Sequence, residues 1–418
     1  MNTVEDFVTP WSMQSTRSFD SWHSMCSYLG AFPPSIANYF IKYFTKEGGL
    51  VMDPFSGRGT TALESRLLNR NSIATDLNPI ALALSRAKNA DLQPKKILSR
   101  ILEIESKYDQ TLYQAEANAQ PDEVHLIFHP RTLAQLCYLK RKLLKSKTQV
   151  DQFLIGITLG ILHGGIRTDG TSGYASIDMP NTFSMSPEYV RKFVQSNQLS
   201  RDFRDVFALL REKTNRLYKK HTPVLQKGIV VRCDAKKLSA NKNLQPYLKK
   251  VDLIVTSPPY LGIVNYAKQN WIRSWFLSQD PESVSKELDD DLSLHEWVTF
   301  SKAVVTELKK FLKRDGIAVF VIGDVAKSRT SVIPLARDFA LMIRESKLFK
   351  YVWCINDAIS DTDKTTRIWA DTKGNATATD RVVFLSDINP FEKFPNPVGI
   401  KKLNFKFIEK STKYFIGS

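Results

Sequence analysis

The alternation of apolar and polar positions along the chain predicts a sheet of short strands separated by helices. Apolar runs rich in β-branched residues, each bounded by turn-forming residues, predict seven strands. They lie at the start of 48–70 and at 71–79, 228–235, 251–257, 316–324, 351–357 and 381–387. Apolar residues at helical spacing predict helices between the strands, including 33–45 and 295–313.

The strand pattern stops for a long interval after the second strand. Residues 80–227 show mainly helical spacing, with one glycine-rich loop at 163–187. We therefore predict an α/β fold with a seven-stranded, doubly wound, mostly parallel sheet and a largely helical insertion. Residues 1–79 and 228–418 are expected to form the sheet-containing domain, and 80–227 the insertion. Ligands of such sheets bind beyond the carboxyl ends of the strands, so we expect the chemistry there.

The charge of the chain favours an anionic partner. Its 418 residues carry 59 Lys and Arg against 43 Asp and Glu, a formal net charge of +16. An excess of this size is typical of proteins that bind nucleic acid, ahead of those that bind an acidic membrane surface. A basic protein without any polyanionic partner remains an open alternative at this point.

The cysteines and the apolar runs argue against several other classes of protein. The four cysteines lie far apart and form no CxxC pair, which disfavours a zinc site and a disulfide framework, and we predict no metal. The longest apolar run, 153–162, is shorter than the ~20 residues needed to cross a bilayer. The first residues do not resemble a signal peptide. We expect a soluble cytoplasmic protein with no membrane partner.

The first strand is followed by a glycine-rich turn and ends in an acid. In the segment DPFSGRGTT, Gly57 and Gly59 permit positive φ and close approach of a ligand to the backbone. Their spacing also fits the loose dinucleotide fingerprint, but Asp53 would repel a pyrophosphate and attract an ammonium group. A cofactor with adenosine at one end and an amino acid at the other meets this requirement, which indicates S-adenosylmethionine.

Acids at the ends of the next two strands favour the same cofactor. Asp76 is placed to bind ribose hydroxyls, and Asp234 to accept a hydrogen bond from the adenine amino group. A single Asp in such a position commonly caps a helix instead. Three acids at three successive strand ends favour the cofactor interpretation over three separate caps.

The strand at 251–257 runs into the segment TSPPY. Pro258 and Pro259 fix φ at consecutive positions and supply no N–H donor. The Ser257 hydroxyl and the Pro258 carbonyl are then expected to face outward beside the ring of Tyr260. Such a corner suits a flat group that carries an amino nitrogen, as a nucleobase rotated out of a duplex does. A Pro-Pro turn with an exposed tyrosine is the structural alternative.

DPFSGRGT followed by TSPPY resembles the bacterial DNA amino-methyltransferases, which methylate N4 of cytosine or N6 of adenine. The resemblance covers about residues 23–90 and 228–390 and implies the Rossmann-like class I methyltransferase fold with S-adenosylmethionine as cofactor. It implies a catalytic motif at Ser257, Pro258, Pro259 and Tyr260. It also implies cofactor binding by Phe32, Asp53, Pro54, Phe55, Ser56, Gly57, Gly59, Thr60, Asp76, Leu77, Asp234 and Ala235. The serine form of the motif is typical of enzymes that act on cytosine N4, with adenine N6 as the alternative.

The mechanism is expected to be direct. None of the four cysteines lies in a Pro-Cys pair, which disfavours covalent methylation of a cytosine carbon. The resemblance implies transfer to an exocyclic nitrogen within a specific sequence of double-stranded DNA, after base flipping. We expect the insertion 80–227 to recognise that sequence, helped by loops at 163–187 and 361–380. A cognate restriction endonuclease is a further candidate partner, and association with the bacterial nucleoid is the expected location; the sequence predicts no oligomeric state.

Three other functions remain open. A methyltransferase acting on RNA or on a protein glutamine would use a related Pro-Pro-Tyr motif. A non-catalytic nucleic-acid-binding protein would keep the same fold as a scaffold. A dinucleotide oxidoreductase is disfavoured by Asp53 and has no use for TSPPY.

Overall fold

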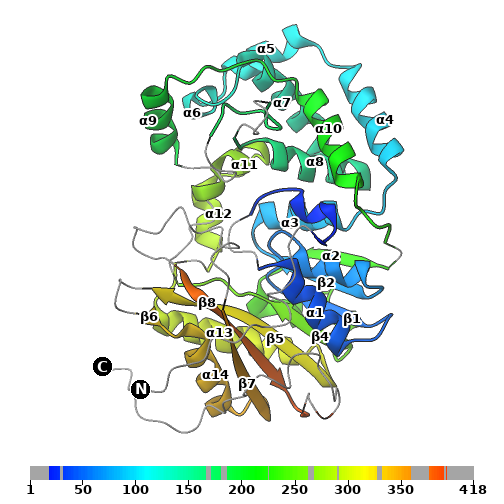
Figure 1. Ribbon diagram of the computed structural model, residues 1–418, viewed down its shortest axis with the longest axis vertical. Coiled ribbons are helices and arrows are strands. Elements are labelled where there is room, and N and C mark those ends of the chain that lie inside the picture. The colour runs from blue at the N-terminus through cyan, green and yellow to red at the C-terminus, as the bar shows by residue number, and fades with distance from the viewer. Residues whose placement is uncertain are drawn as a thin grey trace.

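A mixed β-sheet forms the lower half of the molecule as drawn in Figure 1. The computed structural model describes residues 18–28, 32–165, 171–179, 186–224, 226–261, 268–289, 291–326, 332–358, 376–389 and 392. Within these ranges the strands are β1 Leu50–Asp53, β2 Asn71–Asp76, β3 Gly228–Arg232, β4 Val251–Thr256, β5 Leu312–Ala326, β6 Val332–Ile333, β7 Tyr351–Ala358 and β8 Ala376–Ser386. They are ordered β3-β2-β1-β4-β5-β8-β7, and β6 pairs with β5.

The directions of the strands confirm the predicted fold class. Neighbouring strands from β3 to β5 pair in parallel, whereas β8 runs antiparallel to β5 and β7. All seven predicted strands are present. The prediction missed β6, since its two residues are too few to give an alternating pattern. The helix predicted over 295–313 ends at Lys309, because Phe311 and Leu312 are already buried where β5 begins.

Helices cover both faces of the sheet. The helix α1 (Pro34–Phe44) packs on one face, where its residue Phe40 contacts Phe384 of β8. The other face is covered by α13 (Leu294–Lys309) and α14 (Leu335–Ser346), and Phe339 of α14 contacts Phe320 of β5. Alternate residues of β5 belong to the two cores, as a strand's period of two requires. The sheet is therefore doubly wound, as predicted.

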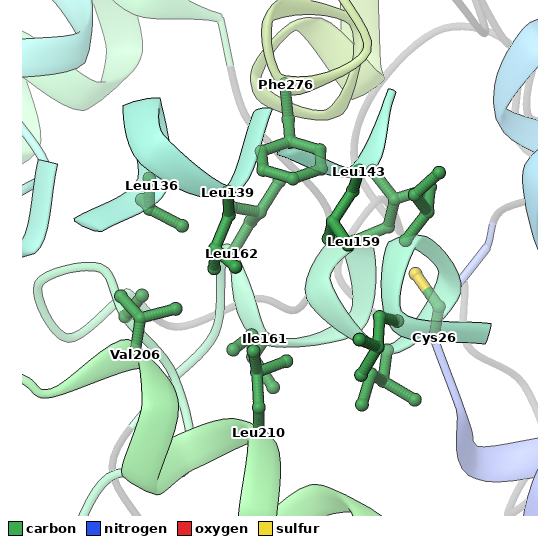
Figure 2. Close-up of a cluster of buried hydrophobic side chains, with 14 of the residues drawn as sticks. Cys26, Leu136, Leu139, Leu143, Leu159, Ile161, Leu162, Val206, Leu210 and Phe276 are labelled. Carbon is green, nitrogen blue, oxygen red and sulfur yellow. The ribbon is translucent and has the colours of Figure 1, made fainter. Parts of the chain in front are cut away.

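A lobe of helices stands above the sheet in Figure 1. Its helices are α3 Pro79–Lys88, α4 Pro94–Glu105, α5 Gln110–Asn118, α6 Asp122–His125, α7 Pro130–Leu143, α8 Gln149–Ile161, α9 Pro187–Asn197, α10 Val206–Tyr218 and α11 Trp271–Phe276, with α12 Pro281–Glu287 between lobe and sheet. Figure 2 shows Leu139, Leu159 and Leu210, which come from three different helices, among the side chains of its core. Cys26 and Phe276 lie in the same core, so residues outside 80–227 complete the lobe.

Small residues on α8 allow the lobe to pack against the amino-terminal segment. A Cβ at Gly160 would overlap the carbonyl oxygen of Met25, and one at Gly156 would overlap Ala87 of α3. The helix α3 in turn contacts β2 and β3, so it connects the lobe to the sheet. No helix in the described ranges has the length and apolar character needed to span a membrane.

Candidate active site

The carboxyl ends of neighbouring strands meet at one edge of the sheet, as the sequence predicts. There they surround a cavity to which the predicted site contributes Pro54, Phe55, Gly57, Asp76, Leu77, Asp234, Ala235, Ser257 and Pro259. The cavity thus takes residues from the glycine-rich turn and from the TSPPY segment. The remaining predicted residues are outside its lining: Phe32, Asp53, Ser56, Gly59, Thr60, Pro258 and Tyr260.

The glycine-rich turn folds onto the end of β2. Gly57 and Gly59 have φ of 48° and 77°, in the left-handed region that favours glycine. The Gly57 N–H donates to Asp76 Oδ2 at 2.9 Å, and the Asn78 N–H donates to Asp76 Oδ1 at 2.9 Å. Removal of the Asp76 carboxyl from water raises its pKa to about 6, against the opposing effect of these bonds. Asp76 therefore fixes the turn and lines the cavity at the same time.

Asp53 lies beneath the turn, away from the cavity wall. It is 2% exposed. Its Oδ1 accepts hydrogen bonds from Thr256 Oγ1 at 2.7 Å and from the Phe55 N–H at 3.1 Å. Burial raises the pKa of the Asp53 carboxyl to about 7. The carboxyl thus connects the end of β4, just before Ser257, to the glycine-rich turn.

Hydrogen bonds hold the TSPPY corner from two sides. The hydroxyls of Ser257 and Tyr260 lie 3.0 Å apart, and the Tyr260 hydroxyl donates to Val321 O at 3.3 Å. The indole N–H of Trp297, on α13, donates to Pro259 O at 2.7 Å. The sequence analysis did not predict this role of Trp297, because in the sequence Trp297 is one of several apolar residues at helical spacing. The Ser257 side chain is left at the cavity wall.

Six further residues complete the cavity, and the sequence analysis named none of them for this role: Tyr28, Asn78, Cys233, Leu288, Asp289 and Phe300. The Tyr28 ring packs beside Gly57, and its hydroxyl accepts a hydrogen bond from Asn78 Nδ2 at 3.0 Å. The rings of Phe300 and Phe55 are 5.9 Å apart. No local motif marks these residues; Cys233 and Asn78 alone could have been found, because each adjoins a predicted acid or its strand end.

The lining has the chemistry that S-adenosylmethionine requires. Flat apolar walls from Phe55 and Phe300 suit an adenine ring, and the carboxylates of Asp76 and Asp234 are acceptors for hydroxyl and amino groups. The ammonium of Lys236 pairs with Asp289 and lies 5.1 Å from the Phe300 ring, so it covers part of the same wall. The residues present therefore fit this cofactor.

The sheet has the class I methyltransferase fold, and the cavity at its edge fits S-adenosylmethionine, the cofactor of that class. The family model described as DNA methylase matches residues 5–86 and 251–394, more than half of the chain. The protein belongs to this family, the DNA amino-methyltransferases that act on N4 or N6.

Two curated relatives match parts of the chain. The type II methyltransferase M.MjaII of Methanocaldococcus jannaschii is 30% identical over 134 residues, which is 31% of this chain and 25% of the relative. The type II methyltransferase M.BamHI of Bacillus amyloliquefaciens is 40% identical over 63 residues, 15% of each chain. The chain thus matches a quarter or less of the length of these relatives.

Solved methyltransferase structures are similar at low identity. The rRNA methyltransferase aviRa of Streptomyces viridochromogenes is 12% identical with a TM-score of 0.32, covering 92% of this chain and 93% of that one. TrmN of Thermus thermophilus is 10% identical with a TM-score of 0.32, covering 88% of this chain and 52% of that one.

Proposed function

We propose that the protein transfers a methyl group from S-adenosylmethionine to the exocyclic N4 of cytosine in a specific sequence of duplex DNA, after the base is rotated out of the helix. The observation that carries this proposal is the shared cavity. Gly57 of the glycine-rich turn lines it together with Ser257 and Pro259 of TSPPY, the proposed catalytic corner. A methyl donor and an amino group bound at these two places would be neighbours. Adenine N6 is the alternative target.

The proposed cofactor residues fall into two groups. Pro54, Phe55, Gly57, Asp76, Leu77, Asp234 and Ala235 would contact the cofactor directly, since they line the cavity. Asp53, Ser56, Gly59 and Thr60 would act by shaping the turn, and Phe32 by supporting the amino-terminal segment. When bound, the cofactor supplies an electrophilic methyl group next to its own positive charge.

The TSPPY corner would hold and orient the amino nitrogen, and the proton that this nitrogen releases on taking up the methyl group would pass to solvent. The Ser257 hydroxyl and the Pro258 carbonyl would accept hydrogen bonds from the amino group and orient its lone pair, while Pro259 and Tyr260 fix their positions. A covalent route is disfavoured here too. Cys233 lines the cavity, but burial raises the pKa of its thiol, so little thiolate is available for attack.

Duplex DNA is the proposed partner, with a cognate restriction endonuclease as a second one and the bacterial nucleoid as the location. The charge of +16 supports binding to a polyanion. Residues 80–227 remain our candidate for target recognition. Of the two loops expected to approach DNA, 163–187 and 361–380, the structure describes residues 163–165, 171–179, 186–187 and 376–380. The rest, which includes Arg167 and Asn181 of the first loop, lies outside the described residues.

Methyl incorporation tests the proposal directly. The protein is incubated with methyl-labelled S-adenosylmethionine and, in separate reactions, unmethylated duplex DNA, structured RNA and bacterial protein extract. We expect label in duplex DNA, and mass spectrometry of its nucleosides to show N4-methylcytosine. N6-methyladenine would select the alternative target, and label in RNA or protein would overturn the assignment to DNA. Absence of cofactor binding by calorimetry, with and without DNA, would favour a non-catalytic nucleic-acid binder.

Two variants of Tyr260 separate stacking of its ring on a base from the hydrogen bonds of its hydroxyl within the TSPPY corner. Tyr260→Ala should weaken DNA binding by ~1–3 kcal/mol, the typical value of one base–aromatic stack. Tyr260→Phe removes the contacts to Ser257 and Val321 O but keeps the ring. It should therefore retain most DNA affinity in a fluorescence anisotropy titration. Equal losses in both variants would mean that the hydroxyl contacts, and not the ring, set DNA affinity.

A further inference from the structure

A second cavity, of about 350 Å³, lies between the lobe and the sheet. It is bounded by the amino-terminal segment near His23 and Cys26, by Arg58, by Tyr174, and by Lys213 and Arg216 of α10. We call it the cationic cavity, because Arg58, Lys213 and Arg216 all line it. Arg58 lies between Gly57 and Gly59 in the glycine-rich turn. Gly57 lines the cavity of the candidate active site, which we call the methyltransferase cavity, so the two cavities share one turn.

Polar groups in and behind the cationic cavity lack partners among the described residues. Lys88 of α3 is 2% exposed, and its Nζ has no hydrogen-bond partner. Its charge interacts with those of Arg58 and Lys213, and burial together with Arg58 places the Lys88 pKa well below its usual range. The buried Nε of Arg216, an N–H donor, also has no hydrogen-bond partner among the described residues. Unpaired buried donors of this kind are costly, which indicates that something else satisfies them.

The nearby acids of the described chain are already engaged elsewhere. Glu64 accepts a hydrogen bond from Asn38 Nδ2 at 2.6 Å and lies 2.6 Å from His23 Nε2. Asp20 pairs with His221 at 3.0 Å and accepts from the Thr222 N–H. Among the described residues, neither Arg58 nor Arg216 forms an ion pair with a carboxylate.

We infer that the cationic cavity binds a phosphate-class oxyanion. The guanidinium groups of Arg58 and Arg216 would donate to its oxygens, Lys213 would add charge while donating to Ser24 O, and Lys88 would gain a counter-ion. A free phosphate and a backbone phosphodiester of nucleic acid offer this same chemistry. The inference concerns a site separate from the methyltransferase cavity and does not require methyl transfer.

Inorganic phosphate is the probe, titrated against the full-length protein at constant ionic strength with chloride as reference. Phosphate should raise the unfolding temperature of the wild type and give a saturable calorimetric signal. Arg216→Gln should raise the phosphate Kd by about tenfold or more, as expected when one charged donor is lost. Lys219→Gln is the matched control, since it removes one charge from an exposed position at the end of the same helix. No phosphate effect on the wild type, or equal losses in both variants, would overturn the inference.

Lys88→Met supplies a second test that does not depend on Arg216. Without phosphate this variant should be at least as stable as the wild type, because it removes an unpaired buried amine. With saturating phosphate the wild type should gain more stability than the variant. Loss of stability in Lys88→Met without phosphate, combined with an unchanged phosphate effect, would contradict a role for Lys88 at an anion site.

A short duplex DNA distinguishes the two sources of phosphate. If the site takes a backbone phosphate, DNA and inorganic phosphate should compete, and Arg216→Gln should weaken DNA binding more than Lys219→Gln does. If the site takes a free oxyanion, phosphate should bind with the same affinity to the protein and to its DNA complex. Either result supports the oxyanion site. Both experiments measure binding, so a failure of the protein to methylate DNA would not change their outcome.

Discussion

Replacing Ser257 by alanine should lower kcat by about two to three orders of magnitude, the usual effect of deleting one group that is aligned with the reacting atoms. Ser257 lines the cavity, and its hydroxyl lies 3.0 Å from that of Tyr260. It is therefore held in place before a substrate arrives. The affinity for S-adenosylmethionine should change little, because the acids and rings proposed to bind the cofactor lie at other strand ends and on α13. Single-turnover methylation and calorimetric titration of the cofactor measure the two effects separately.

Ser72→Ala is the matched control for this experiment. Ser72 is a buried serine of the same sheet, its hydroxyl has no hydrogen-bond partner in the described structure, and it lies near the start of β2, away from the cavity. It should leave kcat and cofactor affinity unchanged. If Ser257→Ala lowered cofactor affinity as strongly as the methylation rate, Ser257 would belong to the cofactor site and the assignment of a catalytic corner would be wrong.

The positions of the strand ends could be predicted because each depends on local sequence. A run such as 251–256 is apolar on both faces, which is typical of a central parallel strand, and it stops where prolines remove the N–H donors. Parallel strands bring their carboxyl ends to one edge, so DPFSGRGTT and TSPPY could be placed together before any coordinates. The structure confirms that the strands before these two segments are parallel and end at the same edge. The shared cavity is a consequence of this arrangement.

The other walls of the cavity depend on packing between distant segments and give no local signal. Phe300 is one apolar residue on α13, and Tyr28 precedes the sheet altogether. The same applies to the lobe, whose core includes Cys26 and Phe276 from outside 80–227. Helical periodicity predicts which face of a helix is buried, but not against which partner. The cationic cavity was missed for this reason, since its charges come from the glycine-rich turn and from α10, which are far apart in the sequence.

The role of Asp53 also changed once its surroundings were known. From sequence, it was expected to meet the ammonium group of the cofactor, and that contact remains a prediction. In the fold its carboxyl accepts hydrogen bonds from Thr256 and Phe55, beneath the wall of the cavity. A pattern of acids at strand ends does not distinguish a carboxylate that faces a ligand from one that joins two turns, because both occupy the same position in the sequence.

Asp53→Ala should lower the free energy of unfolding by ~2–4 kcal/mol, because the Thr256 hydroxyl and the Phe55 N–H lose a common acceptor. Thr256 is fully buried, so its hydroxyl has no water to replace the lost bond. We also expect weaker cofactor binding, since the turn would no longer be tied to β4. Denaturant unfolding and calorimetry of cofactor binding measure these effects. Asp252→Asn, a change in a partly exposed carboxyl at the start of β4, is the control for cofactor affinity.

Asp53→Asn separates the charge of this residue from its hydrogen bonds. The pKa of Asp53 is about 7 in the fold, against an ordinary value of 3.8, so the folded protein retains a proton that the unfolded chain has released. The contribution of Asp53 to the free energy of unfolding should therefore fall as pH rises from about 4 to 7. Asparagine keeps the accepting oxygen and cannot ionise, so the stability of the wild type relative to Asp53→Asn should fall over this pH range. Asp76 and Glu64, whose pKa values burial raises, and His23, whose pKa burial lowers, are present in both proteins and cancel in the comparison.

Cofactor affinity in Asp53→Asn decides between the two roles of the carboxylate. If Asp53 acts through Thr256 and Phe55, as the geometry favours, the asparagine variant should bind S-adenosylmethionine within a few-fold of the wild type at pH 8, while Asp53→Ala binds it more weakly. If the carboxylate pairs with the ammonium group, asparagine should lose affinity as severely as alanine, because a neutral amide cannot replace a charge-assisted bond. The wild type and Asp53→Asn differ in charge, and Asp53→Asn and Asp53→Ala differ in the accepting oxygen, so the three proteins together separate the effect of the charge from that of the hydrogen bonds.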